Sequence, residues 1–268
     1  MNSPLRLYKY EPLNAQTLRN IKGQILYFGS PLNFNDPYDC ALTPRFKPLS
    51  DEEVESLRAF YLAQERLSGS QREEFATSTT EELRGTFARA AASALRDNIS
   101  RVLTTCGITC FSELNSDLLM WSHYGGRYKG ICLEFDTRIE PFDRVRPVNY
   151  VSELPQLDVA DMLMNGNLDQ AIDLFCTKSA SWAYEKEWRA LHKVAGTKYV
   201  YPAEALTGIY FGPDIDGDSL EIVCLVLAGQ NESVMLYRGE RSTTEFRVLF
   251  HEFKYTSYLQ AKKTGLRE

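Results

Sequence analysis

Histidine is scarce in this sequence, and cysteine shows no metal-binding spacing. The 268 residues include only three histidines, and the six cysteines are scattered through mostly apolar segments. Cys106 and Cys110 are close together, but no second pair of cysteines or histidines completes a zinc-binding pattern. We therefore expect no metal site, and we expect buried free thiols of the kind that a reducing cytosol maintains.

Long apolar runs and a net positive charge are also absent. No apolar run approaches the roughly 20 residues of a membrane-spanning helix, and the opening MNSPLRLYKYEPL lacks the apolar stretch of a secretory signal. The formal net charge is −6. Non-specific nucleic-acid binding depends on neutralising phosphates, so this balance argues against it, while a local basic groove stays compatible. We expect a cytoplasmic protein that makes no membrane contact.

What the sequence does contain is a mixture of short strand and helix patterns. Alternating or continuous apolar residues predict strands at 5–10, 25–28, 107–111, 130–135, 148–150, 188–194, 209–211, 235–237 and 246–253. Helical spacing predicts helices at 14–22, 156–177 and 217–228, and a short helix that ends at Gly125. Because the helices do not alternate strictly with the short strands, we expect an α+β fold with a single mixed sheet.

Two capping-box signatures mark a helical segment within this pattern. Ser50 is followed by Glu53, and Thr79 by Glu82, which is the spacing that satisfies the first backbone N–H groups of a helix. Apolar residues at intervals of three and four follow each box. The predicted amphipathic helices cover 50–67 and 80–102, joined by a polar stretch.

These patterns predict one core with an insertion. Residues 1–45 and 105–268 carry the strands and would form the α+β core, while residues 46–104 would form a helical insert. The insert could act as a lid, or it could dock a protein partner or a second copy of the chain.

The loop after the second predicted strand, FNDPYD at 34–39, is dense in turn-forming residues. Asn and Asp side chains often bond to their own backbone in turns, which predicts a rigid, self-bonded loop around Asn35. The alternative is that Asp36 or Asp39 orients a substrate or another catalytic group.

The segment MWSHYG contains one of the three histidines, His123, between a hydroxyl and an aromatic residue. A histidine here can be a core residue, a hydrogen-bond donor or a general base. Ligand contact through Trp121, His123 or Tyr124 is the functional interpretation. Ser122 forms no convincing triad, because neighbours on a helix point apart.

Two glutamates, Glu185 and Glu187, come just before a predicted strand. If that strand begins at Glu185, both carboxylates point to one face, and their repulsion raises the pKa of one of them. The alternative is an ion-pair cluster with Lys186 and Arg189.

Several motifs together resemble a large bacterial family of unknown function. They are LYKY, LYFGSPLNFNDPYDC, CFSELNSDLLMWSHYGGRYKGICLEFD, YEKEWR and IYFG. The resemblance spans nearly the whole predicted core and omits the insert. It implies a shared fold and no particular activity.

A more distant resemblance is to the ADP-ribosyltransferase superfamily. It rests on the opening strand with a polar residue, a second strand that ends in Ser-Pro, and the late Glu-x-Glu preceded by Trp182. The resemblance implies NAD as the substrate. Glu187 would be the catalytic carboxylate that stabilises positive charge on the ribose, and Glu185 would orient the acceptor, a protein or a nucleic acid. It also implies a bacterial toxin or phage-defence effector.

The same resemblance implies contacts for NAD elsewhere in the chain. Arg6 or Tyr8 in the first strand would hold NAD, Ser30 would supply the hydroxyl of the second strand, and aromatic rings would stack on the nicotinamide. The residues expected to bind NAD are Arg6, Tyr8, Tyr10, Ser30, Trp121, His123 and Tyr124. No clear Ser-Thr-Ser segment is present, and the residue of the first strand that faces the pocket stays open among Arg6, Lys9 and the two tyrosines.

Two other functions are compatible with the sequence. A metal-dependent nuclease would use carboxylates to hold Mg²⁺; the available ones are Asp36, Asp39, Glu134, Asp136 and Glu187. A non-catalytic sensor or interaction module would use the aromatic residues, which make up 12% of the chain and favour recognition surfaces.

Overall fold

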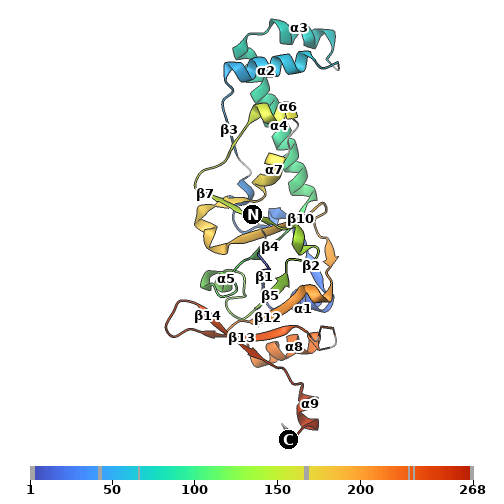
Figure 1. The fold of residues 1–268 in the computed structure, drawn as a ribbon, viewed down its shortest axis with the longest axis vertical. Helices are drawn as coiled ribbons and strands as arrows, with labels where there is room; N and C mark the ends of the chain where they lie inside the picture. Colours follow the sequence, from blue (N-terminus) through green and yellow to red (C-terminus); the bar gives the residue numbers. More distant parts are fainter. Residues whose placement is uncertain are drawn as a thin grey trace. The chain divides into compact units, whose positions relative to one another are not determined.

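The computed structural model describes residues 4–41, 44–65, 67–165, 169–228, 230–231 and 233–265. Contacts within the chain divide it into two compact units. The sheet unit comprises Met1–Ser30, Gly107–Val148 and Ala183–Glu268, and the helical unit comprises Pro31–Cys106 and Asn149–Trp182. Figure 1 shows their elements along the chain.

An eight-stranded sheet organises the sheet unit, in the order β14-β13-β12-β5-β1-β4-β10-β6. Its strands are β1 (Arg6–Glu11), β4 (Gly107–Ser112), β5 (Ile131–Asp136), β6 (Arg146–Pro147), β10 (Glu187–His192), β12 (Leu206–Phe211), β13 (Met235–Arg241) and β14 (Val248–Phe253). The pairing of β12 with β13 is parallel and the others are antiparallel. The predicted α+β fold with one large mixed sheet is confirmed.

One face of this sheet carries the apolar core. Leu7, Phe135 and Ile209 are buried there against α1 (Ala15–Lys22) and α8 (Gly217–Leu227). The core cluster includes Ile21 and Leu26 from the same segment of chain, and a two-stranded ribbon of β2 (Ile25–Tyr27) and β11 (Lys198–Val200) borders it. A C-terminal helix, α9, spans Tyr258–Lys263.

The opposite face of the sheet is aromatic and polar. The short helix α5 (Leu118–His123) places Met120 and Trp121 in a buried cluster with Tyr10 and Tyr210. Polar side chains occupy the rest of this face. We therefore look for a functional site on this face and not on the face that carries the apolar core.

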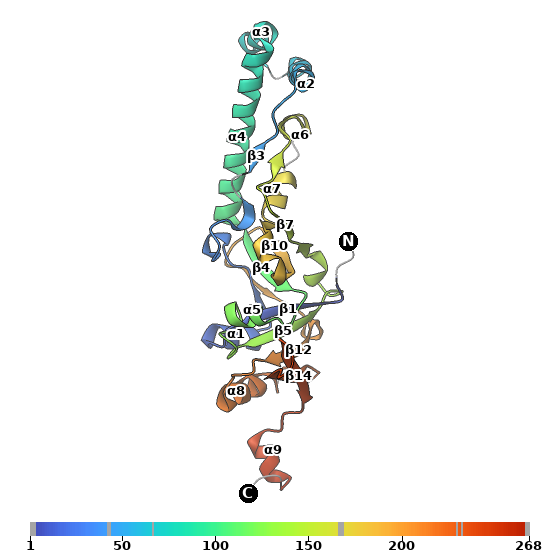
Figure 2. The ribbon, with the colours of Figure 1, turned by 90° about the vertical axis from the view of Figure 1, so that its left-hand side faces the viewer.

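Helices dominate the other unit. They are α2 (Asp51–Leu62), α3 (Gly69–Thr77), α4 (Thr80–Thr105), α6 (Val159–Asn165) and α7 (Asp169–Leu174). Figure 2 shows α6 and α7 beside the long α4. Two short ribbons, β3 (Arg45–Phe46) with β8 (Gln156–Leu157) and β7 (Asn149–Val151) with β9 (Thr177–Ser179), complete the unit. Phe87 and Leu57 are fully buried at its centre.

The structure corrects two predictions of local structure. The polar stretch after residue 67 contains a helix, α3, whose N-cap Ser68 forms a capping box with Gln71. The predicted helix at 156–177 is wrong as one element: a strand and two short helices replace it, and residues 166–168 lie outside the described residues.

The helical unit also contains Asn149–Trp182, which the sequence assigned to the core. An insert bounded at 46–104 therefore stays a prediction. None of the helices in the described part of the chain has the length and apolar character needed to cross a membrane.

Thr79→Ala is expected to lower the free energy of unfolding by about 1 kcal/mol, because the threonine side chain accepts from the Glu82 backbone N–H at the start of α4. Urea unfolding checks this. Thr104→Ala, an exposed threonine near the end of the same helix, should change stability much less. Equal losses in both variants would contradict a capping role for Thr79.

Candidate functional site

A row of polar residues crosses the sheet of the sheet unit. Strand register pairs Glu134 with Tyr8, Tyr8 with Ser112, and Ser112 with Glu187. Residues opposite each other on antiparallel strands point to the same face, so the side chains of these four residues, here called the polar row, share one face. Because neighbouring strands lie about 4.8 Å apart, the Cα atoms of Tyr8 and Glu187 are about 10 Å apart.

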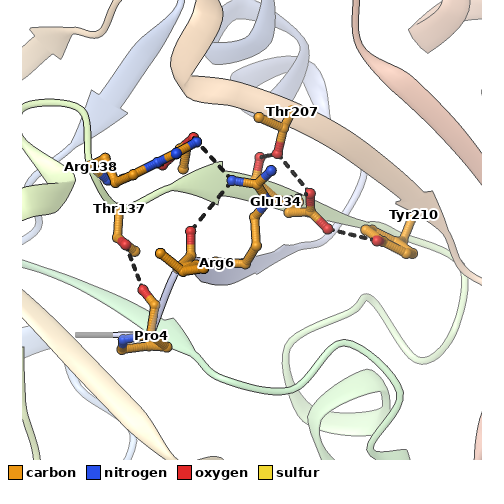
Figure 3. A network of polar contacts seen from close by, with 9 residues as sticks. Pro4, Arg6, Glu134, Thr137, Arg138, Thr207 and Tyr210 are labelled. Carbon is orange, nitrogen blue, oxygen red and sulfur yellow. Dashed lines mark hydrogen bonds and ion pairs between the residues drawn. The ribbon is translucent and has the colours of Figure 1, made fainter. Parts of the chain in front are cut away.

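Glu134, at one end of the polar row, is the centre of a hydrogen-bond network (Figure 3). Its carboxylate accepts from Thr207 Oγ1 at 2.7 Å and from Tyr210 OH at 2.7 Å. Arg6 Nε lies 3.2 Å from the same carboxylate, and Arg6 Nη1 lies 3.0 Å from Asp136. The Arg6 side chain is 39% exposed while that of Glu134 is 13% exposed. Arg6 is thus a positioned cation that solvent can still reach.

Tyr8, next in the polar row, is a neutral phenol at neutral pH. Burial, and then the charge of Glu134, raise its pKa to about 12. Its ring packs edge-on against Tyr210 at 5.8 Å between centroids, and Tyr210 stacks on Tyr237 at 4.4 Å. This end of the face therefore combines a cation, a carboxylate and aromatic rings.

Glu187, at the other end, is held by a buried guanidinium. Arg189 Nε lies 2.7 Å from Glu187 Oε1, and Arg189 Nη2 lies 3.0 Å from Glu187 Oε2. The Arg189 side chain is fully buried and that of Glu187 is 6% exposed. Both come from β10, two positions apart, so both point to the same face. The pair has the two-pronged geometry that makes arginine–carboxylate contacts strong.

Glu185 does not lie on β10, so the prediction that both glutamates share a strand face is wrong. The strand begins at Glu187, after Lys186 in a left-handed conformation (φ 42). Glu185 nevertheless contacts the polar row and Tyr124 through hydrogen bonds. Its carboxylate accepts from Tyr124 OH at 2.6 Å, and its carbonyl accepts from Ser112 Oγ at 2.6 Å.

The residues of the MWSHYG segment have different surroundings. Trp121 is fully buried, donates from its indole nitrogen to the Asn115 carbonyl at 2.7 Å, and packs edge-on against Tyr10 at 5.2 Å. Tyr124 reaches Glu185, whereas His123 is exposed on α5. The structure thus brings Tyr124 to the polar row and places Trp121 and Tyr10 in a buried cluster on the same face of the sheet.

Ser30 lies away from the polar row. The residue before it, Gly29, bridges to Ile108, which is four positions before Ser112 on β4. Four positions of extended strand span about 13 Å. The serine hydroxyl that the structure places in the polar row is that of Ser112, which the sequence did not single out. Its only local signal is a polar residue at the end of an apolar strand.

The FNDPYD loop belongs to the helical unit. Asp36 Oδ1 accepts from the Tyr38 backbone N–H at 2.9 Å, which is the self-bonded turn that the sequence predicts. Asp39 lies 3.3 Å from Lys178, and Asn35 is exposed. Trp182, the aromatic residue of the late motif, is also in this unit.

Four of the carboxylates that a nuclease would use to hold Mg²⁺ contact a lysine or an arginine in the structure. Arg6 contacts Glu134 and Asp136, Arg189 contacts Glu187, and Lys178 contacts Asp39. Within the described residues, no group of three or more His, Cys, Asp or Glu side chains is placed to hold a metal ion. The geometry therefore gives the nuclease alternative no support.

Asp136 makes the stability of the sheet unit pH-dependent. Hydrogen bonds from Arg138, joined by Arg6, hold the pKa of this carboxyl well below its ordinary value. A carboxyl whose pKa is depressed on folding stabilises the protein above its unfolded-state pKa, and the contribution is lost as pH falls below about 4.

Asp136→Asn is therefore expected to lower the free energy of unfolding at pH 6 by only about 1 kcal/mol, because the partner Arg138 is largely exposed. The difference from the unmodified protein should shrink at pH 3. Urea unfolding at both pH values measures it, with the exposed Asp143→Asn as the control. A difference that grows at pH 3 would contradict the assignment.

Comparison with known proteins gives one match. No curated protein and no solved structure matches the chain. Residues 120–190 match the family model described as a protein of unknown function (DUF2971), roughly a quarter of the chain. This segment contains Tyr124, Glu185, Glu187 and Arg189. The predicted resemblance to a family of unknown function is confirmed over this segment, and the family is DUF2971.

Proposed function

We propose that the polar row binds NAD and that the chain transfers ADP-ribose from it to an acceptor. The observation that supports this is the alignment of Tyr8, Ser112 and Glu187 across three neighbouring strands. The distant family resemblance implied Tyr8 as a contact for NAD and Glu187 as the catalytic carboxylate. Such a site needs the side chains of Tyr8 and Glu187 on one face of the sheet. It also needs them close enough for one nicotinamide riboside group to reach both.

Each residue then has a role that its surroundings allow. Tyr8, neutral at physiological pH, offers a ring and a hydroxyl to the nicotinamide. Arg6, partly exposed, offers a cation to the phosphates. When the ribose–nicotinamide bond breaks, its electron pair leaves with nicotinamide, and Glu187 stabilises the positive charge left on the sugar. The acceptor nucleophile bonds to that carbon and gives its proton to Glu185.

Glu187→Gln is expected to lower the rate of nicotinamide release from NAD by about 100-fold or more, the usual cost of removing one electrostatic contact to a transition state. Release is measured by chromatography, with and without cell lysate as the source of acceptor. Glu11→Gln is the matched control, since Glu11 lies on β1 outside the polar row and pairs with Lys9.

Because Glu187→Gln also disturbs a buried ion pair, Tyr8→Phe is tested beside it. Removal of one hydroxyl contact should slow release about tenfold. It should lower the free energy of unfolding by only about 1 kcal/mol, because the hydroxyl also forms hydrogen bonds with Glu134 and Tyr210. If the unmodified protein releases no nicotinamide under any of these conditions, the transferase proposal is wrong.

A second candidate function, ligand binding without chemistry, is favoured by the Arg189–Glu187 pair. A carboxylate already bound by a guanidinium at two points has less charge to offer a reacting sugar. This function predicts that NAD binds and is not consumed. Calorimetric titration with NAD, run beside the release assay, separates the two functions.

A further inference from the structure

The helical unit contains a cavity of about 310 Å³ that the polar row does not use. It is near the lower end of the volumes of small-molecule pockets. Two segments far apart in sequence supply its polar and aromatic lining, together with residues 151–154. These lining residues are Asp36, Tyr38, Lys178, Ser179, Ser181 and Trp182.

A buried cation forms part of the cavity wall. Lys178 Nζ lies 3.3 Å from Asp39 Oδ2, and the two side chains are only 4% and 5% exposed. The same nitrogen lies 4.9 Å from the centroid of the Trp182 ring. An ion pair and a cation–π contact thus fix the position of the ammonium group before any ligand arrives.

Two carboxylates line the same cavity, Asp36 and Glu153. Asp36 Oδ1 is held by the Tyr38 backbone N–H at 2.9 Å, and Glu153 pairs with Arg45 at 2.8 Å. An anionic ligand would be repelled by the two carboxylates, and a cationic ligand by Lys178. A hydroxyl group suits both, because it accepts a hydrogen bond from an ammonium group and donates one to a carboxylate. Ser179 and Ser181 add further hydroxyl partners.

Aromatic rings complete the lining. Trp182 is held in the wall by Lys178, and Tyr38 is largely exposed at the same cavity. Aromatic faces give apolar contact area to the C–H face of a ring, while the ring's hydroxyls reach polar groups at its edge.

We propose that this cavity binds a neutral ring with several hydroxyl groups, either a free saccharide or the ribose of a nucleoside. This goes beyond the proposed function, since no residue of the polar row lines the cavity. It also gives the FNDPYD loop a role: Asp36 contacts the ligand, and Asp39 positions Lys178.

Saturation-transfer NMR and calorimetry test this with three probes: methyl glucoside, adenosine and inorganic phosphate. At least one neutral ring is expected to bind, and phosphate is not. Binding of adenosine alone would identify the nucleoside as the source of the ring, and 2′,3′-dideoxyadenosine should then bind about tenfold more weakly because the diol is missing. Binding of phosphate in preference to both rings would overturn the proposal.

Trp182→Ala is expected to weaken the binding of the neutral ring about tenfold or more. Tyr258→Ala, an exposed tyrosine on α9, should leave it unchanged. Ser181→Ala removes one hydroxyl from the cavity wall and should weaken binding several-fold. It serves as the test if Trp182→Ala does not fold. Binding that survives both wall substitutions unaltered, or absence of binding by either ring, would reject the site. Glu187→Gln should not affect this binding, so its outcome is independent of the release assay.

Discussion

Arg189→Met is expected to lower the free energy of unfolding by about 3–5 kcal/mol, because it removes a buried cation that contacts the carboxylate of Glu187 at two points. The guanidinium is fully buried, and both of its contacts to Glu187 are short. Urea unfolding followed by circular dichroism measures the change.

The control for this substitution is Arg247→Met. Arg247 also pairs with a glutamate, Glu245, but both side chains are more than half exposed, and a pair of that kind contributes at most about 1 kcal/mol. The double variant of Arg189→Met with Glu187→Gln should recover part of the lost stability, because it also removes the buried negative charge that lost its contact with Arg189. Similar losses for Arg189→Met and Arg247→Met would contradict the account of the buried pair.

Trp121→Ala is expected to destabilise the sheet unit by about 3–5 kcal/mol, as truncation of a large buried aromatic residue usually does. Trp121 is fully buried, and its indole N–H bonds to the Asn115 carbonyl. The ring also fills space up to the backbone: a Cβ on Gly125 would lie 2.5 Å from it.

Leu119→Ala on the same helix is the matched control for Trp121→Ala. Leu119 is exposed, so its truncation should change stability by less than about 0.5 kcal/mol. Thermal unfolding of the two variants checks this. A small loss for Trp121→Ala would contradict a role of the indole in the packing of this face, and it would favour the contact with a ligand that the sequence suggested.

Local patterns predicted much of the fold. The strands predicted at residues 5–10 and 107–111 correspond to β1 and β4, because an alternating pattern or a short apolar run is a property of the segment itself. The capping boxes at Ser50 and Thr79 are present with both of their hydrogen bonds. Signals carried by a few neighbouring residues could therefore be read without a structure.

The composition of the polar row could not be predicted in this way. Ser112 joins Tyr8 to Glu187 only through the register of three strands that are distant in sequence, and register depends on the packing of whole faces. Glu185 lies just outside the strand, which shows how an error of two positions at an element boundary changes the direction of a side chain.

The cavity of the helical unit could not be predicted either, because it too depends on the pairing of segments that are distant in sequence. Asp36 lies in a predicted turn, and Lys178 lies far from it in the sequence, seven positions before Glu185. The parallel pairing of β7 with β9 places residues 149–151 next to 177–179. Because that pairing joins residues that are distant in sequence, no local pattern predicted it.

Tyrosine NMR tests most directly whether NAD binds on the polar row. The protein, which has 15 tyrosines, is labelled with ¹³C in the tyrosine rings, and the signals of Tyr8 and Tyr124 are assigned from Tyr8→Phe and Tyr124→Phe. Titration with NAD should shift both signals saturably and leave the exposed Tyr27 and Tyr258 unchanged. Unchanged Tyr8 and Tyr124 signals at the highest NAD concentration, or shifts confined to other tyrosines, would contradict the account.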